Sequence, residues 1–176
     1  MDTGSTAITL RPMRLEDVAQ VHAVDQLSFA LPWSERSFRF ELNENPNSLL
    51  WVAEVKDENG ASRVVGMIVV WIIVDEAHVG TIAVHPDYRR LHVGQKLLAQ
   101  SLLAAMERGA VQSLLEVRRG NLGAQAMYLR FGYEVVGERP HYYQDNKEDA
   151  LLMTLSPLDE VKLRAFLGSS TGMIEV

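Results

Sequence analysis

The chain contains no cysteine among its 176 residues. Disulfide bonds, thiolate nucleophiles and thiolate metal ligands are therefore excluded. The side chains that remain as the best metal ligands, the histidines, are scattered without the close spacing of a metal site, at positions 22, 78, 85, 92 and 141. We therefore expect no bound metal ion.

Basic residues and long apolar runs are also scarce. Lys and Arg number 17 against 23 Asp and Glu, a formal net charge of -6, so non-specific binding to nucleic acid has no overall electrostatic support. The longest apolar run, residues 64–74 with one internal glycine, is far shorter than the roughly 20 residues that cross a membrane. The opening MDTGSTAITL lacks the basic start and apolar stretch of a secretory signal. We expect a soluble, cytoplasmic protein that binds neither nucleic acid nor membranes.

Hydrophobic residues, by contrast, make up 47% of the chain, enough for the core of a single domain. Their spacing alternates between the two-residue period of strands and the 3.6-residue period of helices. This pattern predicts helices over 15–29, 34–42, 94–108 and 122–131. It predicts strands over 8–13, 49–55, 63–74, 77–84, 113–117, 133–137 and 150–155, the third of them central and buried on both faces.

The two ends of the chain lie outside this alternating region. We expect residues 1–7 to form a flexible N-terminus and residues 156–176 to form a C-terminal tail. The tail contains one candidate short helix over 157–167, followed by the segment GSSTG, which we expect to be disordered. The sequence assigns no function to the tail.

A basic loop joins the strand over 77–84 to the next helix. Its sequence is HPDYRRLHVGQKLL over residues 85–98, and its second residue, Pro86, ends the strand. At such a junction, unpaired backbone N–H groups and the positive end of a helix meet at one point, which favours an anion such as phosphate. Neither a Walker loop nor a dinucleotide-binding fingerprint is present. A solvated basic turn is the alternative interpretation of the loop alone.

The longer stretch IAVHPDYRRLHVGQKLL resembles the acetyl-CoA signature of the GCN5-related N-acetyltransferases (GNAT). That signature is Gln/Arg-x-x-Gly-x-Gly/Ala, matched here by residues 89–94, with His92 at the first glycine position. The segment over 115–155, LEVRRGNLGAQAMYLRFGYEVVGERPHYYQDNKEDALLMTL, resembles the RimI-like branch, and PWS at 32–34 fits that branch too. The resemblance covers most of residues 8–155, which we expect to form the acetyltransferase domain.

The resemblance implies an α/β fold of the α+β kind, with a mixed, mostly antiparallel central sheet flanked by helices. Two adjacent parallel strands, one ending near Val84 and the other beginning near Leu114, would splay apart and admit the pantetheine arm of acetyl-CoA, the co-substrate. Backbone N–H groups before the loop would hold the thioester carbonyl, at Ile82, Ala83 and Val84. The pyrophosphate would be wrapped by Arg89, Arg90, Leu91, His92, Val93, Gly94 and Gln95.

The resemblance also assigns catalytic roles. Glu116 would act as general base through a water molecule, and Tyr128 as general acid at the CoA sulfur, with Asn121 and Tyr128 touching the CoA arm. Each has a plainer alternative: an ion pair between Glu116 and Arg118, core packing for Tyr128, and a helix cap at Asn121. Three aromatic residues would either line the acceptor groove or pack loops against the core: Trp33, Tyr142 and Tyr143.

The predicted reaction is direct acetyl transfer to the N-terminal α-amine of a protein, with a ribosomal protein as one candidate acceptor. No acyl-enzyme nucleophile is recognisable in the sequence. A lysine or small-amine acetyltransferase and a non-catalytic CoA-binding module remain alternatives, and the oligomeric state is left open. A side chain at His92 would be costly if the loop needs a positive φ there, whereas a charged imidazole would help to bind phosphate.

Overall fold

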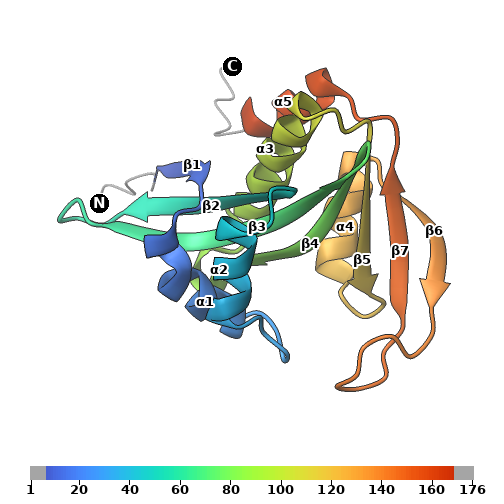
Figure 1. Ribbon diagram of the computed structural model, residues 1–176, viewed down its shortest axis with the longest axis horizontal. Helices are drawn as coiled ribbons and strands as arrows, with labels where there is room; N and C mark the ends of the chain where they lie inside the picture. The colour runs from blue at the N-terminus through green and yellow to red at the C-terminus, as the bar shows by residue number, and fades with distance from the viewer. Residues whose placement is uncertain (1–6, 169–176) are drawn as a thin grey trace, which may run out of the picture.

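The computed structural model of the chain describes residues 7–168. Its centre is a seven-stranded sheet with the order β1-β2-β3-β4-β5-β7-β6 (Figure 1). Neighbouring strands are antiparallel except β4 and β5, which run parallel. The expected mixed, mostly antiparallel sheet is therefore confirmed. Its strands are β1 (Ile8–Pro12), β2 (Ser48–Lys56), β3 (Ser62–Ile73), β4 (Glu76–Val84), β5 (Gln112–Arg118), β6 (Glu134–Arg139) and β7 (Ala150–Leu155).

Helices cover both faces of the sheet, so that two hydrophobic clusters form (Figure 1). One cluster packs α3, α4 and α5 against the sheet, and the other packs α1 and α2. Strand β3 contributes to both, which confirms that it is buried on its two faces. The helices are α1 (Val18–Gln26), α2 (Glu35–Asn43), α3 (Val93–Glu107), α4 (Leu122–Phe131) and α5 (Glu160–Gly168), with short 3-10 turns η1 (Leu15–Asp17) and η2 (Pro86–Tyr88).

Local sequence signals fix several of the helix ends. Ser34 accepts a hydrogen bond from the Ser37 N–H at 3.1 Å and begins α2. Asn121 caps α4 in the same way, and Gly132 ends that helix in the left-handed conformation at φ 98°. These caps agree with the sequence predictions.

The first predicted helix is wrong in its extent. Residues 15–17 form a 3-10 turn, and α1 ends at Gln26 instead of continuing to residue 29. The early end has a local cause, because the N–H groups of Ser28 and Phe29 both bond the Asp25 carbonyl and the Ser28 hydroxyl bonds the Val24 carbonyl. These contacts turn the chain into the loop between α1 and α2.

At the C-terminal end, the expected helix starts at Glu160, three residues later than predicted. The Asp159 carboxylate accepts the Lys162 N–H at 3.1 Å and so caps it. We expected residues 1–7 to be flexible, but all of them except Ala7 lie outside the described residues. The part of the expected tail that follows Gly168 also lies outside them.

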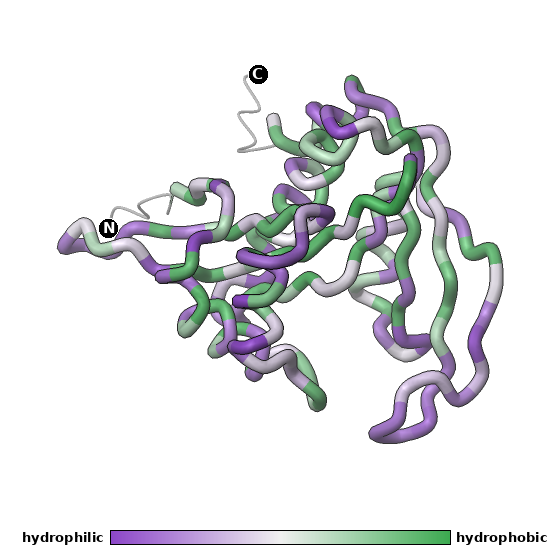
Figure 2. Tube along the Cα trace, in the orientation of Figure 1, coloured by the Kyte–Doolittle hydropathy of each residue, from purple (hydrophilic) through white to green (hydrophobic). Residues whose placement is uncertain are grey.

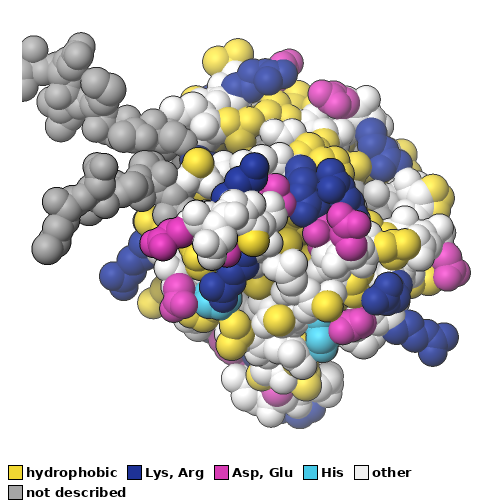
Figure 3. Space-filling model, turned by 90° about the vertical axis from the view of Figure 1, so that its left-hand side faces the viewer, with side chains coloured by type: hydrophobic (Ala, Val, Ile, Leu, Met, Phe, Trp, Pro, Cys, Tyr) yellow, Lys and Arg dark blue, Asp and Glu magenta, His cyan; other side chains and the backbone are white. Residues whose placement is uncertain are grey.

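The hydropathy of the trace follows this architecture. In Figure 2 the inner strands are mainly green and the loop between β6 and β7 is mainly purple. No helix within residues 7–168 is long and apolar enough to cross a membrane. Acidic and basic side chains are interspersed on the face shown in Figure 3.

The parallel pair β4 and β5 parts after four residue pairs. The pairing runs from Glu76 with Gln112 to Val79 with Leu115, although both strands continue beyond it. Just past this point the β3–β4 register shifts, so that Gly80 has no partner on β3. The two strands then diverge, as Figure 1 shows. The splay that the family resemblance implied is therefore present.

Candidate active site

Two cavities meet where β4 and β5 diverge. The α4-side cavity, of about 520 Å³, is lined by α4, both strands and the loops that follow α1 and β6. The β7-side cavity, of about 530 Å³, is lined by the strands, by β7 and by the same two loops. The two cavities share the lining residues Trp33, Val79, Gly80, Leu115, Glu116 and Tyr143. The strands therefore open a passage between the two faces of the sheet.

Glu116 lies in this shared region, on the side of β5 that alternates with the buried residues of the strand. Its Oε1 atom is 3.3 Å from Arg139 Nε. A hydrogen bond to Glu116 is the main reason that the pKa of Tyr142 is raised, with burial the next cause. The alternative interpretation of Glu116 as the partner of Arg118 is wrong, because Arg118 binds other carboxylates. Glu116 is thus held by β6 and by the β6–β7 loop.

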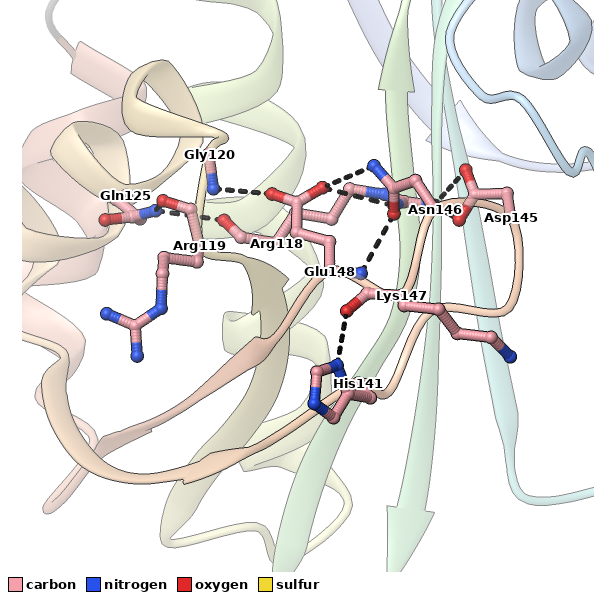
Figure 4. Close-up of polar contacts among 9 residues, drawn as sticks. All are labelled: Arg118, Arg119, Gly120, Gln125, His141, Asp145, Asn146, Lys147 and Glu148. Carbon is pink, nitrogen blue, oxygen red and sulfur yellow. Dashed lines mark hydrogen bonds and ion pairs between the residues drawn. The ribbon is translucent and has the colours of Figure 1, made fainter.

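Arg118 connects the end of β5 to the loop between β6 and β7 (Figure 4). Its Nη2 atom bonds both carboxylate oxygens of Asp145, at 3.0 and 3.1 Å, and its Nη1 atom lies 3.3 Å from Glu148. The guanidinium also lies over the Tyr143 ring, 3.8 Å from its centroid. The Gly120 N–H donates a hydrogen bond to Glu148 Oε2 at 2.7 Å, and this bond is the main reason that the pKa of Glu148 is lowered. This network fixes the loop over the α4-side cavity.

Tyr128 projects from α4 into the α4-side cavity with only 4% of its surface exposed. Burial raises its pKa well above the ordinary value, so the phenol is protonated at neutral pH. Its ring packs at a tilt against Tyr133, with centroids 5.6 Å apart. Within residues 7–168 its hydroxyl makes no hydrogen bond and remains able to donate one to a ligand. Asn121 lines the same cavity while its side chain caps α4 by accepting the Ala124 N–H at 3.2 Å.

The predicted pyrophosphate loop follows β4 and η2. Ile82 lines the α4-side cavity, whereas Ala83 and Val84 continue along β4 toward the loop. His92 precedes α3 with φ 59° and ψ 21°, so this position does adopt the left-handed conformation that favours glycine. Arg90 is left-handed too, at φ 64°.

The side chains of this loop divide into two groups. Those of Arg89, Arg90, Leu91 and His92 lie at the surface, and Arg89 Nε bonds the Val84 carbonyl at 3.2 Å. Val93 and Gln95 are buried, and Gln95 accepts a bond from Arg130 at 2.9 Å. Buried side chains leave only backbone groups for a ligand at these positions. A Cβ added to Gly94, between them, would lie in ordinary contact range of Met127, at 3.5 Å, and of Val84 on β4, at 3.6 Å.

The aromatic residues singled out in the sequence lie at the two cavities. Trp33 and Tyr143 line both, and Tyr142 lines the β7-side cavity. Burial raises the pKa of Tyr143 to about 12. Tyr142 and Tyr143 contact each other edge to face, with centroids 5.2 Å apart.

Three features of the site were missed in the sequence. Arg139 lies two strands away from Glu116, and only the β5-β7-β6 order brings the two together. Trp71 was assigned simply to a buried strand, yet its indole lines the β7-side cavity. Asp25 is fully buried and accepts the Trp33 N–H at 2.6 Å. A polar residue on the apolar side of a predicted helix was a signal for Asp25, whereas nothing local pointed to Arg139.

No group of three or more His, Asp or Glu side chains within residues 7–168 is arranged to hold a metal ion. The groups at the junction are the Glu116 carboxylate, the Tyr128 phenol and the backbone of β4. A carboxylate can accept a proton from an amine, and a phenol can donate to a leaving group. This combination suits transfer of an acyl group to nitrogen.

Comparisons with known proteins agree with this chemistry. The Acetyltransferase (GNAT) family matches residues 18–133. A "Putative ribosomal protein bS18-alanine N-acetyltransferase" from Bacillus subtilis (strain 168) is 39% identical over 148 residues, 84% of this chain and 95% of that protein. The ribosomal protein bS18-alanine N-acetyltransferase of Escherichia coli (strain K12) is 30% identical over 149 residues, 84% of this chain and 96% of that protein.

A solved structure gives the same result. The crystal structure of the ribosomal-protein-S18-alanine N-acetyltransferase from Escherichia coli superposes with a TM-score of 0.74 at 28% identity, covering 97% of this chain and 99% of that one. The sequence and structural comparisons thus identify the same family. The chain belongs to the acetyltransferase (GNAT) family and is an N-acetyltransferase.

Proposed function

We propose that this enzyme transfers the acetyl group of acetyl-CoA to the N-terminal α-amine of a cytoplasmic protein. The alanine N-terminus of ribosomal protein bS18, which the relatives from Bacillus subtilis and Escherichia coli are named for, is the leading candidate acceptor. The observation that carries the proposal is the place of Glu116, in the region shared by the two cavities. A base at this point can reach an amine that enters from one cavity while the thioester enters from the other.

The α4-side cavity is the proposed site of the pantetheine arm. Beyond Val79 the β5-facing edge of β4 has no partner strand in the described part of the chain, so its backbone groups can bond the amides of the arm. The backbone N–H groups of Ile82, Ala83 and Val84 are the candidates that polarise the thioester carbonyl. Asn121 and Tyr128 line the opposite wall.

The pyrophosphate is proposed to lie at the start of α3. Arg90 and His92 are both left-handed there, which turns successive backbone N–H groups of this loop toward one side. The positive end of the fifteen-residue helix adds a favourable field for an anion. Arg89, Leu91, Val93, Gly94 and Gln95 complete the proposed cradle. The side chains at Val93 and Gln95 contribute to packing, because they are buried.

The β7-side cavity is the proposed acceptor site, with Trp33, Tyr142 and Tyr143 as its aromatic walls. Glu116 removes a proton from the α-ammonium, directly or through a water molecule, and the free amine attacks the thioester carbon. The new C–N bond forms and the C–S bond breaks; Tyr128 gives its proton to the departing thiolate and takes up the second proton that the nitrogen loses. The products are the acetylated N-terminus and CoA.

A peptide panel tests the proposal. The enzyme and acetyl-CoA are incubated with peptides that have free Ala, Ser or Met N-termini and with N-blocked peptides that contain lysine, and acetyl groups are mapped by mass spectrometry. Modification of the α-amine is the expected result. Modification of lysine alone would refute the N-terminal acceptor, while the pantetheine and catalytic roles would still stand.

A further inference from the structure

A third hollow, which we call the outer groove, lies beside the acceptor site. Its volume is about 550 Å³, and its lining includes Pro32, Ser34, Arg36, Ser37, Phe40 and Glu41. Trp33 and Trp71 complete this lining, and the same two side chains also line the β7-side cavity. The two indoles therefore stand between the outer groove and the proposed acceptor site.

Contacts of the backbone and of the rings hold Trp33 and Trp71 in place. Their rings stack nearly parallel, with centroids 5.9 Å apart and an interplanar angle of 15°. The backbone N–H of Trp33 donates to Asp25 Oδ2 at 2.6 Å, and its backbone carbonyl is 2.9 Å from His22 Nδ1. The Trp71 indole N–H donates to Glu41 Oε2 at 3.0 Å. Each tryptophan is thus fixed by one helix, Trp33 by α1 and Trp71 by α2.

Trp71 also lies directly on the splayed strand. A Cβ added to Gly80 would come within 2.8 Å of Trp71 Cη2, so the ring covers the one residue of β4 that has no β3 partner. Gly80 lines both cavities, next to Glu116. The far edge of the indole is therefore close to the point where the acceptor amine has to react.

Resting on the function proposed above, we infer that Trp33 and Trp71 are specificity-determining residues that limit the size of the acceptor's first side chain. When the amine is placed at Glu116, the first side chain of the acceptor points into a cavity that these indoles close. The indoles cannot move aside without losing their mutual stacking, and Trp71 would also lose its hydrogen bond to Glu41. Small first residues fit in front of the wall, whereas large ones collide with it.

Replacement of either indole by a smaller side chain would join the outer groove to the acceptor site. The added space would accept leucine or phenylalanine as first residue. A pocket that only binds an extra methylene distinguishes substrates by roughly 10- to 200-fold, so a change of this order is measurable. The third tryptophan, Trp51, is half-buried on β2 and lines none of the three hollows, which makes it the matched control.

The experiment compares kcat/KM for acetylation of peptides that differ only in the first residue: Gly, Ala, Ser, Val, Leu and Phe. For the wild type we expect kcat/KM to fall at least roughly tenfold between Ala and Leu. In Trp71→Leu and in Trp33→Leu we expect the Leu-to-Ala ratio to rise at least roughly tenfold, and in Trp51→Leu to stay unchanged. Circular dichroism checks that each variant is folded. If a variant is not folded, the wild-type kcat/KM values for first residues of increasing size decide whether the indoles limit the acceptor.

The outcomes separate this inference from the function on which it rests. A wild type that acetylates Leu and Phe peptides as fast as Ala peptides overturns the wall and leaves N-terminal acetylation intact. An unchanged Leu-to-Ala ratio of kcat/KM in both folded variants would also overturn the wall and leave N-terminal acetylation intact. Absence of α-amine acetylation on every peptide of the series would instead overturn the proposed function itself.

Discussion

The carboxylate of Glu116 lies 3.3 Å from the guanidinium of Arg139, although the two residues come from strands that are not neighbours in the sheet. Strand β7 lies between them, and the Tyr142 hydroxyl bonds the same carboxylate. Glu116 is therefore held from the side of β6 and the β6–β7 loop. A positively charged amine that enters the β7-side cavity meets a carboxylate whose direction is already set.

Replacement of this carboxylate tests its role as base. In Glu116→Gln the side chain keeps its shape but no longer accepts a proton, so we expect kcat to fall by roughly 10²- to 10⁴-fold. The KM for acetyl-CoA should change little, because in the proposed function the pantetheine is held by backbone groups. Steady-state kinetics with an Ala-initiated peptide measure both constants. Glu138→Gln is the control, since Glu138 is a β6 carboxylate that pairs with Arg119 outside both cavities; equal losses in the two variants would argue against a base at Glu116.

The loop between β6 and β7 is expected to depend on Arg118. Arg118→Lys keeps the charge but loses the two bonds to Asp145 and the stacking on Tyr143. We expect the KM for the acceptor peptide to rise by roughly tenfold, with a smaller change in kcat, because the bidentate pair holds Arg118 over Tyr143, which lines the proposed acceptor cavity. Arg119→Lys is the matched control, because its ion pairs are half-exposed and such pairs contribute little. A kcat loss without a KM change would place Arg118 in the chemical step instead.

His92 gives a prediction about stability. Its left-handed backbone, at φ 59°, is disfavoured for any residue with a Cβ, and glycine relieves that cost. We expect His92→Gly to stabilise the enzyme by about 1 kcal/mol, seen as a rise of roughly 2–4 °C in Tm. His92→Ala, which keeps the Cβ, should not show this gain.

Titration with CoA at several pH values tests whether the His92 imidazole also binds phosphate. If it does, we expect the dissociation constant of CoA to depend less on pH in His92→Gly than in the wild type. An unchanged pH dependence would exclude this role.

The sequence was sufficient for the strands and most helix ends, because these depend on local signals, whereas the splay was implied by the family resemblance. Alternating apolar residues predicted the strands, and Ser34, Asn121 and Gly132 marked helix ends by their own backbone bonding. The resemblance supplied Glu116 and Tyr128, and the structure places both on the cavities at the splay. Their roles stay predictions until the variants are measured.

The contacts across the sheet were beyond the sequence. Arg139 and Glu116 are brought together by strand order. An ion pair of Arg118 with Glu116 was the alternative interpretation, because residues two apart share a strand face. The arginine turns instead to Asp145 and Glu148, since those carboxylates lie on the loop that folds over the end of β5. Trp33 and Trp71 meet for a similar reason: a loop and a distant strand pack on the same side of the sheet. Such pairings depend on tertiary packing, which spacing along the chain does not encode.

Asp25 predicts how the stability of the enzyme depends on pH. Burial raises the pKa of its carboxyl group, and one of its oxygens has no hydrogen-bond partner among the described residues. The folded state therefore favours the protonated form, so the stability that this group contributes is fully present below its ordinary pKa near 4 and is lost as the pH rises through the raised value. Asp25→Asn resembles the protonated form and can still accept the Trp33 N–H. We expect the variant to become more stable than the wild type as the pH rises. Its free energy of unfolding should exceed that of the wild type by about 1 kcal/mol at pH 7, or 2–4 °C in Tm, and the two should be equal near pH 4.

The control for this pH dependence is Asp17→Asn, because the stability that Asp17 contributes changes with pH in the opposite direction. Burial acts to raise the pKa of Asp17, but the hydrogen bonds from Arg11, at 2.7 and 2.8 Å, and from the Arg14 N–H lower it below the ordinary value. The stability from Asp17 is therefore present above the ordinary pKa and is lost as the pH falls through the lowered one. Asp17→Asn should lower Tm at pH 7 and approach the wild type in acid. Thermal unfolding of both variants from pH 4 to pH 8 measures the two slopes, and a Tm loss for Asp25→Asn that is the same at every pH would show that the carboxylate is ionised and needed where it lies.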